Sequence, residues 1–357
     1  MNHTLDRPMH RRTALALVGG ALAASAAPAF AQDAGKAARD LALYTGADRE
    51  ARLIELAKKE GELSVYHVYP ALPAVMTAFT KKTGVKVRAW RSGSEAVLQR
   101  VLAEARGGRF EVDIVQNNAP EQEAATSEKL LQEVWSPGLK DLLPGTAPAH
   151  RCWAGIALDV WVAAYNTQAV KPDEVPRSYA DLLDPRWKGR LAIEANNHVW
   201  FNTLLAEMGE DSGLKFFNQL VASNGISARK GHSVLANLVA SGDIPLALTV
   251  YSWIPEQLKK KGAPIASVAL QPLLSQASAV ALMRRAPNPA SALLFHDFMV
   301  GLEGQKVMAD AQFVPTNRLV DSPWARTPMK MVDAVRALEN QDRWQKLFDD
   351  TIIKKAK

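Results

Sequence analysis

The stretch Glu62-Leu-Ser-Val-Tyr-His67 opens the part of the chain that decides the fold, and it has the composition of a short β-strand. A helical pattern over residues 71–82 follows it, and Val85-Lys-Val-Arg-Ala-Trp90 then alternates apolar and polar residues as a second strand. Residues 94–106 return to helical spacing, and Val112-Asp-Ile-Val-Gln116 predicts a third strand. Because strands and helices alternate, the sequence predicts an α/β fold built from βαβ units on a parallel sheet.

Two later β-rich stretches, at residues 153–166 and 276–284, are long for ordinary strands. The strand–helix alternation resumes between them, so we expect two α/β lobes joined by two crossing strands, with a ligand cleft between the lobes. Ligands of open α/β sheets lie beyond the carboxyl ends of strands, where helix N-termini present free N–H groups. The predicted division is lobe 1 at 32–157 with 280–325, lobe 2 at 158–279, and a C-terminal helical tail at 326–357.

Composition excludes several classes of protein. The 357 residues are 48% hydrophobic and 22% charged, which is ordinary globular composition. The formal net charge of +6 comes without a basic block, so a nucleic-acid surface is not expected. Because Cys152 is the sole cysteine, neither an intramolecular disulfide nor a cysteine-based zinc site can form.

The N-terminus predicts export. Arg11 and Arg12 precede an uncharged stretch, and Ala29-Phe30-Ala31 matches the small-x-small pattern of a signal-peptidase site. We expect residues 1–31 to be a signal peptide cleaved after Ala31, by either the general or the twin-arginine route, which places the mature protein in the periplasm. The alternative is an uncleaved anchor, although Gly and Ala make a poor membrane-spanning helix.

Several stretches resemble one family, the periplasmic solute-binding proteins of ABC transporters, and within it the ferric-binding-protein-like branch. They are Val160–Thr167, Tyr179–Arg190 with Leu-Leu-Asp-Pro-Arg-Trp-Lys-Gly inside it, Leu246–Gly262, and Glu303-Gly-Gln305 followed by Phe313-Val-Pro-Thr-Asn317. The resemblance implies a two-lobed type II periplasmic-binding-protein fold, each lobe a mainly parallel sheet flanked by helices. It also implies a non-enzymatic, monomeric receptor that closes on a small solute and delivers it to an inner-membrane permease.

The resemblance is weaker at the ligand. Ferric-binding relatives carry a Tyr-Tyr pair at the end of a second-lobe strand, where this chain has Tyr251-Ser252, and Asn117-Asn118 stands where some relatives have an acid. Tyr251 is therefore the leading iron ligand if iron binds. No resident cofactor is expected. The solute remains open between ferric iron with an anion or chelate, a phosphonate or phosphate ester, and a small carboxylate or amine.

We expect solute contacts from residues that end predicted strands or open predicted helices: Tyr66, His67, Tyr69, Ser92, Ser94, Asn118, His198, Trp200 and Tyr251. Each has a structural alternative. Tyr66, Trp200 and Tyr251 can instead pack in a core, while the short polar residues and His67 can cap helices or stabilise turns.

Two other functions remain open at this point. A secreted hydrolase could use Ser233, but Gly231-x-Ser233 lacks the closing glycine of a nucleophile elbow. A sensor of the same fold could dock on a chemoreceptor instead of a permease.

Overall fold

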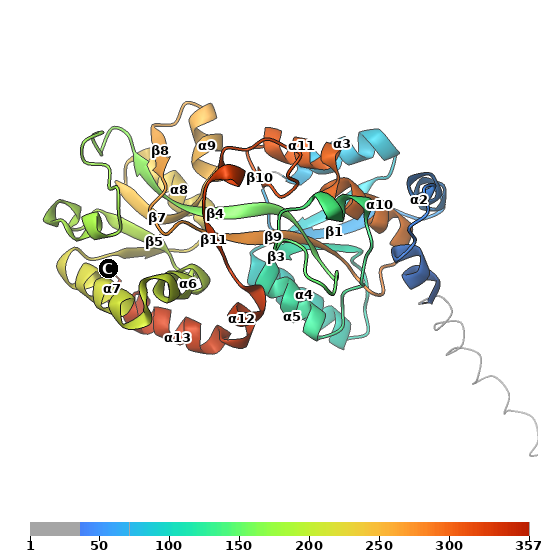
Figure 1. The fold of residues 1–357 in the computed structure, drawn as a ribbon, viewed down its shortest axis with the longest axis horizontal. Coiled ribbons are helices and arrows are strands. Elements are labelled where there is room, and N and C mark those ends of the chain that lie inside the picture. The colour runs from blue at the N-terminus through green and yellow to red at the C-terminus, as the bar shows by residue number, and fades with distance from the viewer. Residues whose placement is uncertain (1–35, 71, 357) are drawn as a thin grey trace, which may run out of the picture.

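The computed structural model describes residues 36–70 and 72–356, so the predicted signal peptide at 1–31 lies outside the described residues. Within this part of the chain, strands form one continuous mixed sheet in the order β2-β1-β3-β9-β4-β7-β5-β6. Figure 1 shows that the molecule is elongated, with one group of strands and helices at each end and β4 and β9 running between them.

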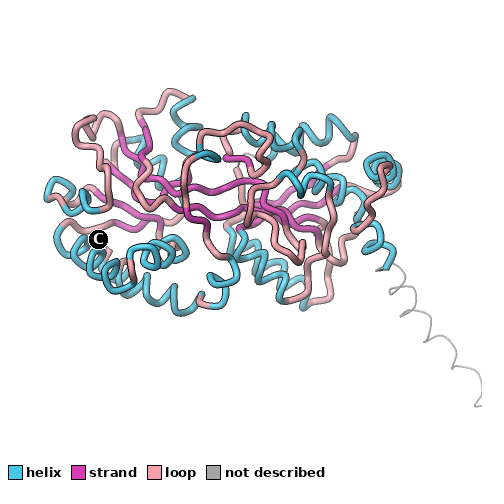
Figure 2. Tube along the Cα trace, viewed as in Figure 1, coloured by secondary structure: helices cyan, strands magenta, loops and turns pink. Residues whose placement is uncertain are grey.

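The first group surrounds three strands that are parallel to one another, as the sequence predicts. These strands are β1 (Leu63–His67), β2 (Val87–Arg91) and β3 (Ile114–Asn118). The helices of this group are α2 (Arg49–Ala57), α3 (Leu72–Thr83), α4 (Ser94–Arg106), α5 (Ala119–Ser127), α10 (Pro289–Val300) and α11 (Leu302–Asp310). Helices cover both faces of the sheet, which leaves β1 buried along its whole length (Figure 2).

The second group is built on β5, to which β6 and β7 are both parallel. Its strands are β5 (Leu191–Glu194), β6 (Ser227–Arg229), β7 (Leu246–Tyr251) and β8 (Ile265–Val268). Its helices are α6 (His198–Met208), α7 (Glu210–Ser223), α8 (His232–Ser241) and α9 (Trp253–Lys260). A separate aromatic-rich core, with Trp187, Phe201 and Phe217 fully buried, holds this group together.

The two long strands predicted from the sequence are β4 (Ala154–Asn166) and β9 (Leu274–Leu282). They pair antiparallel with each other, and β3 and β7 flank them, also antiparallel. The sheets of the two lobes are therefore parallel at their ends and are fused through an antiparallel centre. Nearly every residue of β4 and β9 is buried, because packed elements cover both faces.

The C-terminal tail, which the sequence predicts to be helical, contains a short strand and two separate helices. It begins with a short strand, β11 (Lys330–Met331), that is parallel to β9. Asp333 then caps α12 (Ala334–Glu339) by accepting a hydrogen bond from the backbone N–H of Arg336, which starts a new helix, and α13 (Gln341–Thr351) follows. Helix α12 packs on α5 of the first lobe and α13 on α6 of the second, so the tail spans both lobes.

Candidate functional site

Polar side chains gather on one face of the central strands, where the two lobes meet. Asp159 of β4 lies directly opposite Gln276 of β9, and Trp161 of β4 lies opposite Tyr251 at the end of β7. Because directly opposite residues and alternate residues of one strand project to the same face, Asp159, Gln276 and Tyr251 share a face. We call the group that surrounds them the Tyr251 cluster: Tyr69, Asp159, Glu194, His232, Tyr251 and Gln276.

Asp159 is fully buried on β4. The hydroxyl of Tyr69 donates to its Oδ1 at 2.9 Å, and the indole N–H of Trp253 donates to the same oxygen at 3.0 Å. Its other oxygen, Oδ2, has no hydrogen-bond partner among the described residues. Burial disfavours the ionised form and raises the pKa of Asp159 to about 7, although the two donors act in the opposite direction.

Tyr251 connects the two central strands with the second lobe. Its hydroxyl oxygen accepts a hydrogen bond from the side-chain amide of Gln276 at 2.9 Å, and its ring centroid lies 4.0 Å from that of His232. Burial, followed by the negative charges of Asp159 and Glu194, raises the pKa of Tyr251 well above its ordinary value. The phenol is therefore neutral, and among the described residues its hydroxyl is bonded only as the acceptor of Gln276.

His232 opens α8, and its Nδ1 lies 2.8 Å from the carbonyl oxygen of Thr249. Since a carbonyl only accepts, Nδ1 carries the proton and donates it. Burial lowers the pKa of His232, which keeps the ring neutral. Glu194 ends β5 and fixes this end of the second lobe by accepting the backbone N–H groups of Asn196 and Gly231 at 2.7 and 2.8 Å.

The first lobe contributes the N-terminal ends of α4 and α5. Glu121 lies in the first turn of α5, and Ser94 is the first residue of α4. Burial raises the pKa of Glu121 to about 7, a hydrogen bond with Ser94 lowers it, and the charge of Glu95 raises it. The charge of Glu121 also raises the pKa of Tyr251, so this carboxylate acts across the boundary between the lobes.

The structure brings most of the predicted contacts to this region. Tyr69 and Tyr251 are members of the Tyr251 cluster, and Ser94 lowers the pKa of Glu121. Asn118 precedes the first residue of α5 without capping it through its side chain. His198 opens α6, and its pKa is lowered by burial, while charges including those of Glu194 and Glu95 act against that shift.

His67 and Ser92 hold the backbone that leads to Tyr69 and to α4. His67 is buried, and its Nδ1 bonds the carbonyl oxygen of Tyr69 at 2.9 Å, which fixes the loop that presents Tyr69. The backbone N–H of Ser92 donates to the carbonyl of His67, and this bond ties the entry to α4 to the end of β1.

Two predicted contacts lie in packed cores, and their structural alternatives hold. The hydroxyl of Tyr66 donates to Glu104 of α4 at 2.9 Å, and its ring packs edge-on against Trp90. Trp200 is 1% exposed and packs against Tyr179 and Phe217 in the core of the second lobe. Tyr66 lies near the end of β1 and Trp200 in the first turn of α6, but both side chains are buried in packed cores. Tyr66 and Trp200 are therefore removed from the candidate site.

The sequence analysis missed Asp159, Glu194, Gln276 and Glu121. A signal was present for Asp159, because a lone carboxylate in the apolar stretch Ala154–Asn166 has to be either paired or functional. Gln276 and Glu194 carried no such signal, since only the strand register and the turn after β5 bring them to Tyr251.

Two other features lie outside this site. Ser233, the nucleophile of the hydrolase hypothesis, is exposed, and no hydrogen bond among the described residues joins it to a histidine.

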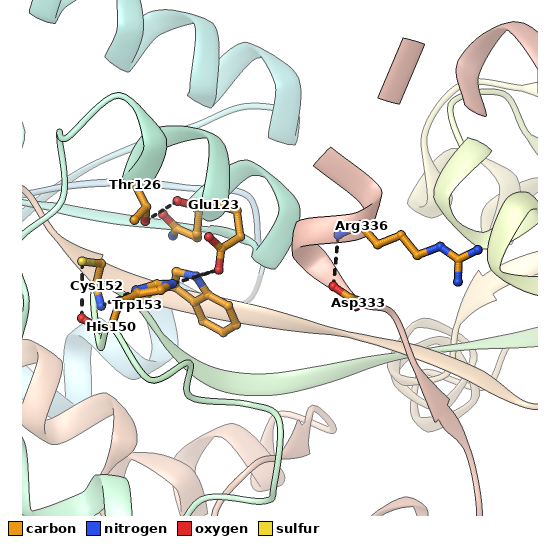
Figure 3. A network of polar contacts seen from close by, with 8 residues as sticks. Glu123, Thr126, His150, Cys152, Trp153, Asp333 and Arg336 are labelled. Carbon is orange, nitrogen blue, oxygen red and sulfur yellow. Dashed lines mark hydrogen bonds and ion pairs between the residues drawn. The ribbon is translucent and has the colours of Figure 1, made fainter. Parts of the chain in front are cut away.

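Figure 3 shows a second polar network, in which Glu123 of α5 accepts from the indole N–H of Trp153 at 2.9 Å and bonds His150 at 3.0 Å. It fixes α5 to the start of β4, and burial raises the pKa of the neighbouring Cys152 thiol, which makes that thiol a poor nucleophile.

A hollow of about 360 Å³ lies behind the central strands. Its lining includes Leu158 and Ser275, which alternate along β4 and β9 with Asp159 and Gln276 and so face the opposite side of the sheet.

In the described residues, no group of three or more His, Cys, Asp or Glu side chains is arranged to hold a metal ion. Over the same residues, no helix is long and apolar enough to cross a membrane.

The sequence profile of the bacterial extracellular solute-binding proteins matches residues 113–340, which is more than half of the chain. The chain belongs to this family. It is 27% identical over 180 residues to the Fe(3+)-binding periplasmic protein of Serratia marcescens, covering 50% of this chain and 52% of that protein. It is also 24% identical over 288 residues to a putative 2-aminoethylphosphonate-binding periplasmic protein of Salmonella typhimurium, covering 77% of this chain and 82% of that protein.

Among solved structures, the periplasmic binding protein AfuA of Actinobacillus pleuropneumoniae, with fructose-6-phosphate bound, superposes with a TM-score of 0.71 at 22% identity. The superposition covers 82% of this chain and 99% of AfuA. At this level of identity the likeness establishes the fold alone, and it confirms the predicted two-lobed type II fold of the periplasmic binding proteins. The match to the Serratia protein spans about half of that protein's length.

Proposed function

We propose that this chain is the periplasmic substrate-binding component of an ABC importer, which captures a small solute between its lobes and delivers it to an inner-membrane permease. One observation carries the proposal. Where the two lobes meet, Asp159 has a buried oxygen that no described residue bonds, and Tyr251 beside it has a hydroxyl. A buried polar atom left unpaired costs about 1–3 kcal/mol, so a ligand that satisfies it gains affinity.

The geometry also supports capture by closure of the lobes. The first lobe presents Glu121 and Ser94, the second presents Glu194 and His232, and the strands that carry Asp159 and Gln276 belong to both. A solute that contacts all three sets binds the closed arrangement better than the open one. Such differential affinity shifts an open–closed equilibrium toward the closed state.

Two further points belong to the proposal. The proposed role is non-enzymatic, as the matched family of solute-binding proteins suggests, and no hydrogen bond among the described residues joins Ser233 to a histidine. The chain acts as a monomer and is exported by the N-terminal segment that precedes residue 32. Ferric iron, as cargo and not as a resident cofactor, stays a candidate solute because of the Serratia relative, with the Tyr251 phenolate as its leading protein ligand.

The test is native mass spectrometry of the mature protein purified from periplasm, with elemental analysis of the same sample. We expect a bound solute near one per chain and, when it is added back to stripped protein, a rise in Tm and a smaller radius of gyration by X-ray scattering. A protein that carries no solute and gains no stability from any small solute contradicts the proposal. Uptake lost on deletion of the chromosomal permease separates an importer component from a chemoreceptor-docking sensor.

A further inference from the structure

Two fully buried aspartates of this chain differ in how their oxygens are satisfied. Asp113 precedes β3, and its Oδ2 accepts from the backbone N–H of Ser64 at 2.8 Å and from the side chain of Asn288 at 3.1 Å, while its Oδ1 accepts from the backbone N–H of Asn288. That is the pattern of a structural carboxylate. Asp159 is equally buried, but both of its donors bond Oδ1, and no residue of 36–70 or 72–356 donates to Oδ2. Asp159 is therefore missing a partner that brings hydrogen-bond donors.

The charges around this unpaired oxygen are acidic. The ionisable groups that act most strongly on Tyr69 and Tyr251 are Asp159, Glu194 and Glu121. Those acting most strongly on His198 and His232 are likewise carboxylates. A positively charged ligand group that enters here is attracted by these carboxylates, whereas an anionic group is repelled by them.

Aromatic rings surround the same place. Tyr69 stacks on Phe313 with ring centroids 4.4 Å apart and meets Trp253 edge-on at 5.8 Å, while Tyr251 lies 6.3 Å from Trp253. Aromatic faces attract alkylammonium groups through their quadrupole, and the attraction strengthens where water is excluded. Acidic oxygens and aromatic faces together are the two features that recognise a protonated amine.

We propose that the Tyr251 cluster binds a positively charged nitrogen of the solute, an alkylammonium group whose N–H donates to the free oxygen of Asp159. The proposal rests on the function inferred above and narrows the solute to an amine-bearing molecule. Tyr251 and Gln276 border this nitrogen, and Glu121 contributes charge from the first lobe.

The experiment compares each amine with its counterpart that lacks nitrogen. Three matched pairs are titrated calorimetrically into stripped mature protein: 2-aminoethylphosphonate with ethylphosphonate, β-alanine with propionate, and putrescine with 1,4-butanediol. Native mass spectrometry of the protein purified from periplasm adds the natural solute to the set. In at least one pair, or for the natural solute, we expect the amine to bind about tenfold or more tightly than its counterpart, as for a hydrogen bond to a charged group.

Variants then assign that preference to Asp159. Asp159→Asn is expected to reduce the amine preference to within about threefold of unity. The control Asp113→Asn makes the same chemical change at an equally buried carboxylate at the far end of β3, and it should keep the preference of the wild type even if its Tm falls. Should Asp159→Asn fail to fold, Glu121→Gln is the second variant, with an expected partial loss of the same preference.

The outcomes are distinct. A natural solute without a basic nitrogen, co-purified iron, or an amine preference that Asp159→Asn leaves unchanged overturns the amine assignment while the receptor function stands. A protein that binds none of the probes and carries no solute overturns both.

Discussion

The hydroxyl of Tyr69, in the loop after β1, donates a 2.9 Å hydrogen bond to Asp159, ninety positions further along the chain on the crossing strand β4. This bond joins the first lobe to the strand that passes into the second. The ring of Tyr69 is held in turn by Phe313 on one face and by Trp253 at its edge. The carboxylate is thereby fixed in place without being fully satisfied, which is the arrangement of a preorganised binding group.

The raised pKa of Asp159 makes stability depend on pH in a specific direction. In the folded protein this pKa is about 7, whereas the ordinary value of 3.8 applies to the unfolded chain. The folded state therefore binds the proton more tightly, and the stabilisation this provides is lost as pH rises toward 7. Asp159→Asn removes the effect, so its stability relative to the wild type should rise by about 2 kcal/mol between pH 5 and pH 8.

Urea unfolding of both proteins at several pH values measures this difference, from which the other titrating groups cancel. Asp350→Asn is the control. The side chains of Lys346 and Lys354 lower the pKa of Asp350 to about 2, so that group stays ionised throughout and the variant should keep a constant offset from the wild type. A constant offset for Asp159→Asn as well would show that Asp159 does not titrate near neutrality.

His67 should stay neutral far below the pH at which an ordinary histidine is protonated. Burial lowers its pKa to about 4, and the positive charge of Arg91 adds to this, while the hydrogen bond to the Tyr69 carbonyl acts the other way. Because the unfolded chain takes up the proton near pH 6.5, His67 costs stability as pH falls from there toward 4. Nitrogen-15 NMR should find the Nδ1-protonated neutral ring down to about pH 4, and a midpoint near 6.5 would refute the burial argument.

Two of the motifs that carry the family resemblance have structural roles, so they help to predict the fold but not the solute. In Leu-Leu-Asp-Pro-Arg-Trp-Lys-Gly, Asp184 caps a short helix by accepting from the backbone N–H of Arg186, and Trp187 fills the core of the second lobe. Gln305 accepts the backbone N–H of Thr316 and donates to the carbonyl of Ile156, and so it fixes the Phe313–Asn317 turn to β4.

The local sequence pattern was sufficient to predict the strands, most helices and the two crossing strands, because each shows either a regular hydrophobic period or an apolar run. It was insufficient to predict in which direction the side chains at the ends of these elements point. Tyr66 and Tyr69 lie three positions apart, but the first turns into the core beside Glu104 and the second reaches Asp159. That choice depends on the twist of the strand and on the packing partner, neither of which a single sequence displays.

A substitution at Trp200 tests whether this side chain packs in the core or contacts the solute. Trp200→Leu leaves space beside Tyr179 and Phe217, and we expect it to lower the free energy of unfolding by about 3 kcal/mol. At a temperature where the variant is folded, its affinity for the solute should stay within about threefold of the wild type. Denaturant unfolding and calorimetric titration measure the two quantities. A large loss of affinity at unchanged stability would return Trp200 to the candidate site.

Tyr251→Phe should show the opposite combination of effects. The substitution keeps the ring on His232 and removes the hydroxyl, so the empty protein loses the acceptor of Gln276 at a cost of about 1 kcal/mol. Solute affinity should fall about tenfold or more, because the same hydroxyl oxygen borders the solute nitrogen beside Asp159 and can accept a hydrogen bond from it. Tyr165→Phe, on the same strand as Asp159 but near its far end, is the matched control and should change neither quantity appreciably. If Tyr251→Phe instead collapses the stability of the empty protein while the remaining folded fraction binds normally, Tyr251 belongs to the core and the cluster must be centred on Asp159 alone.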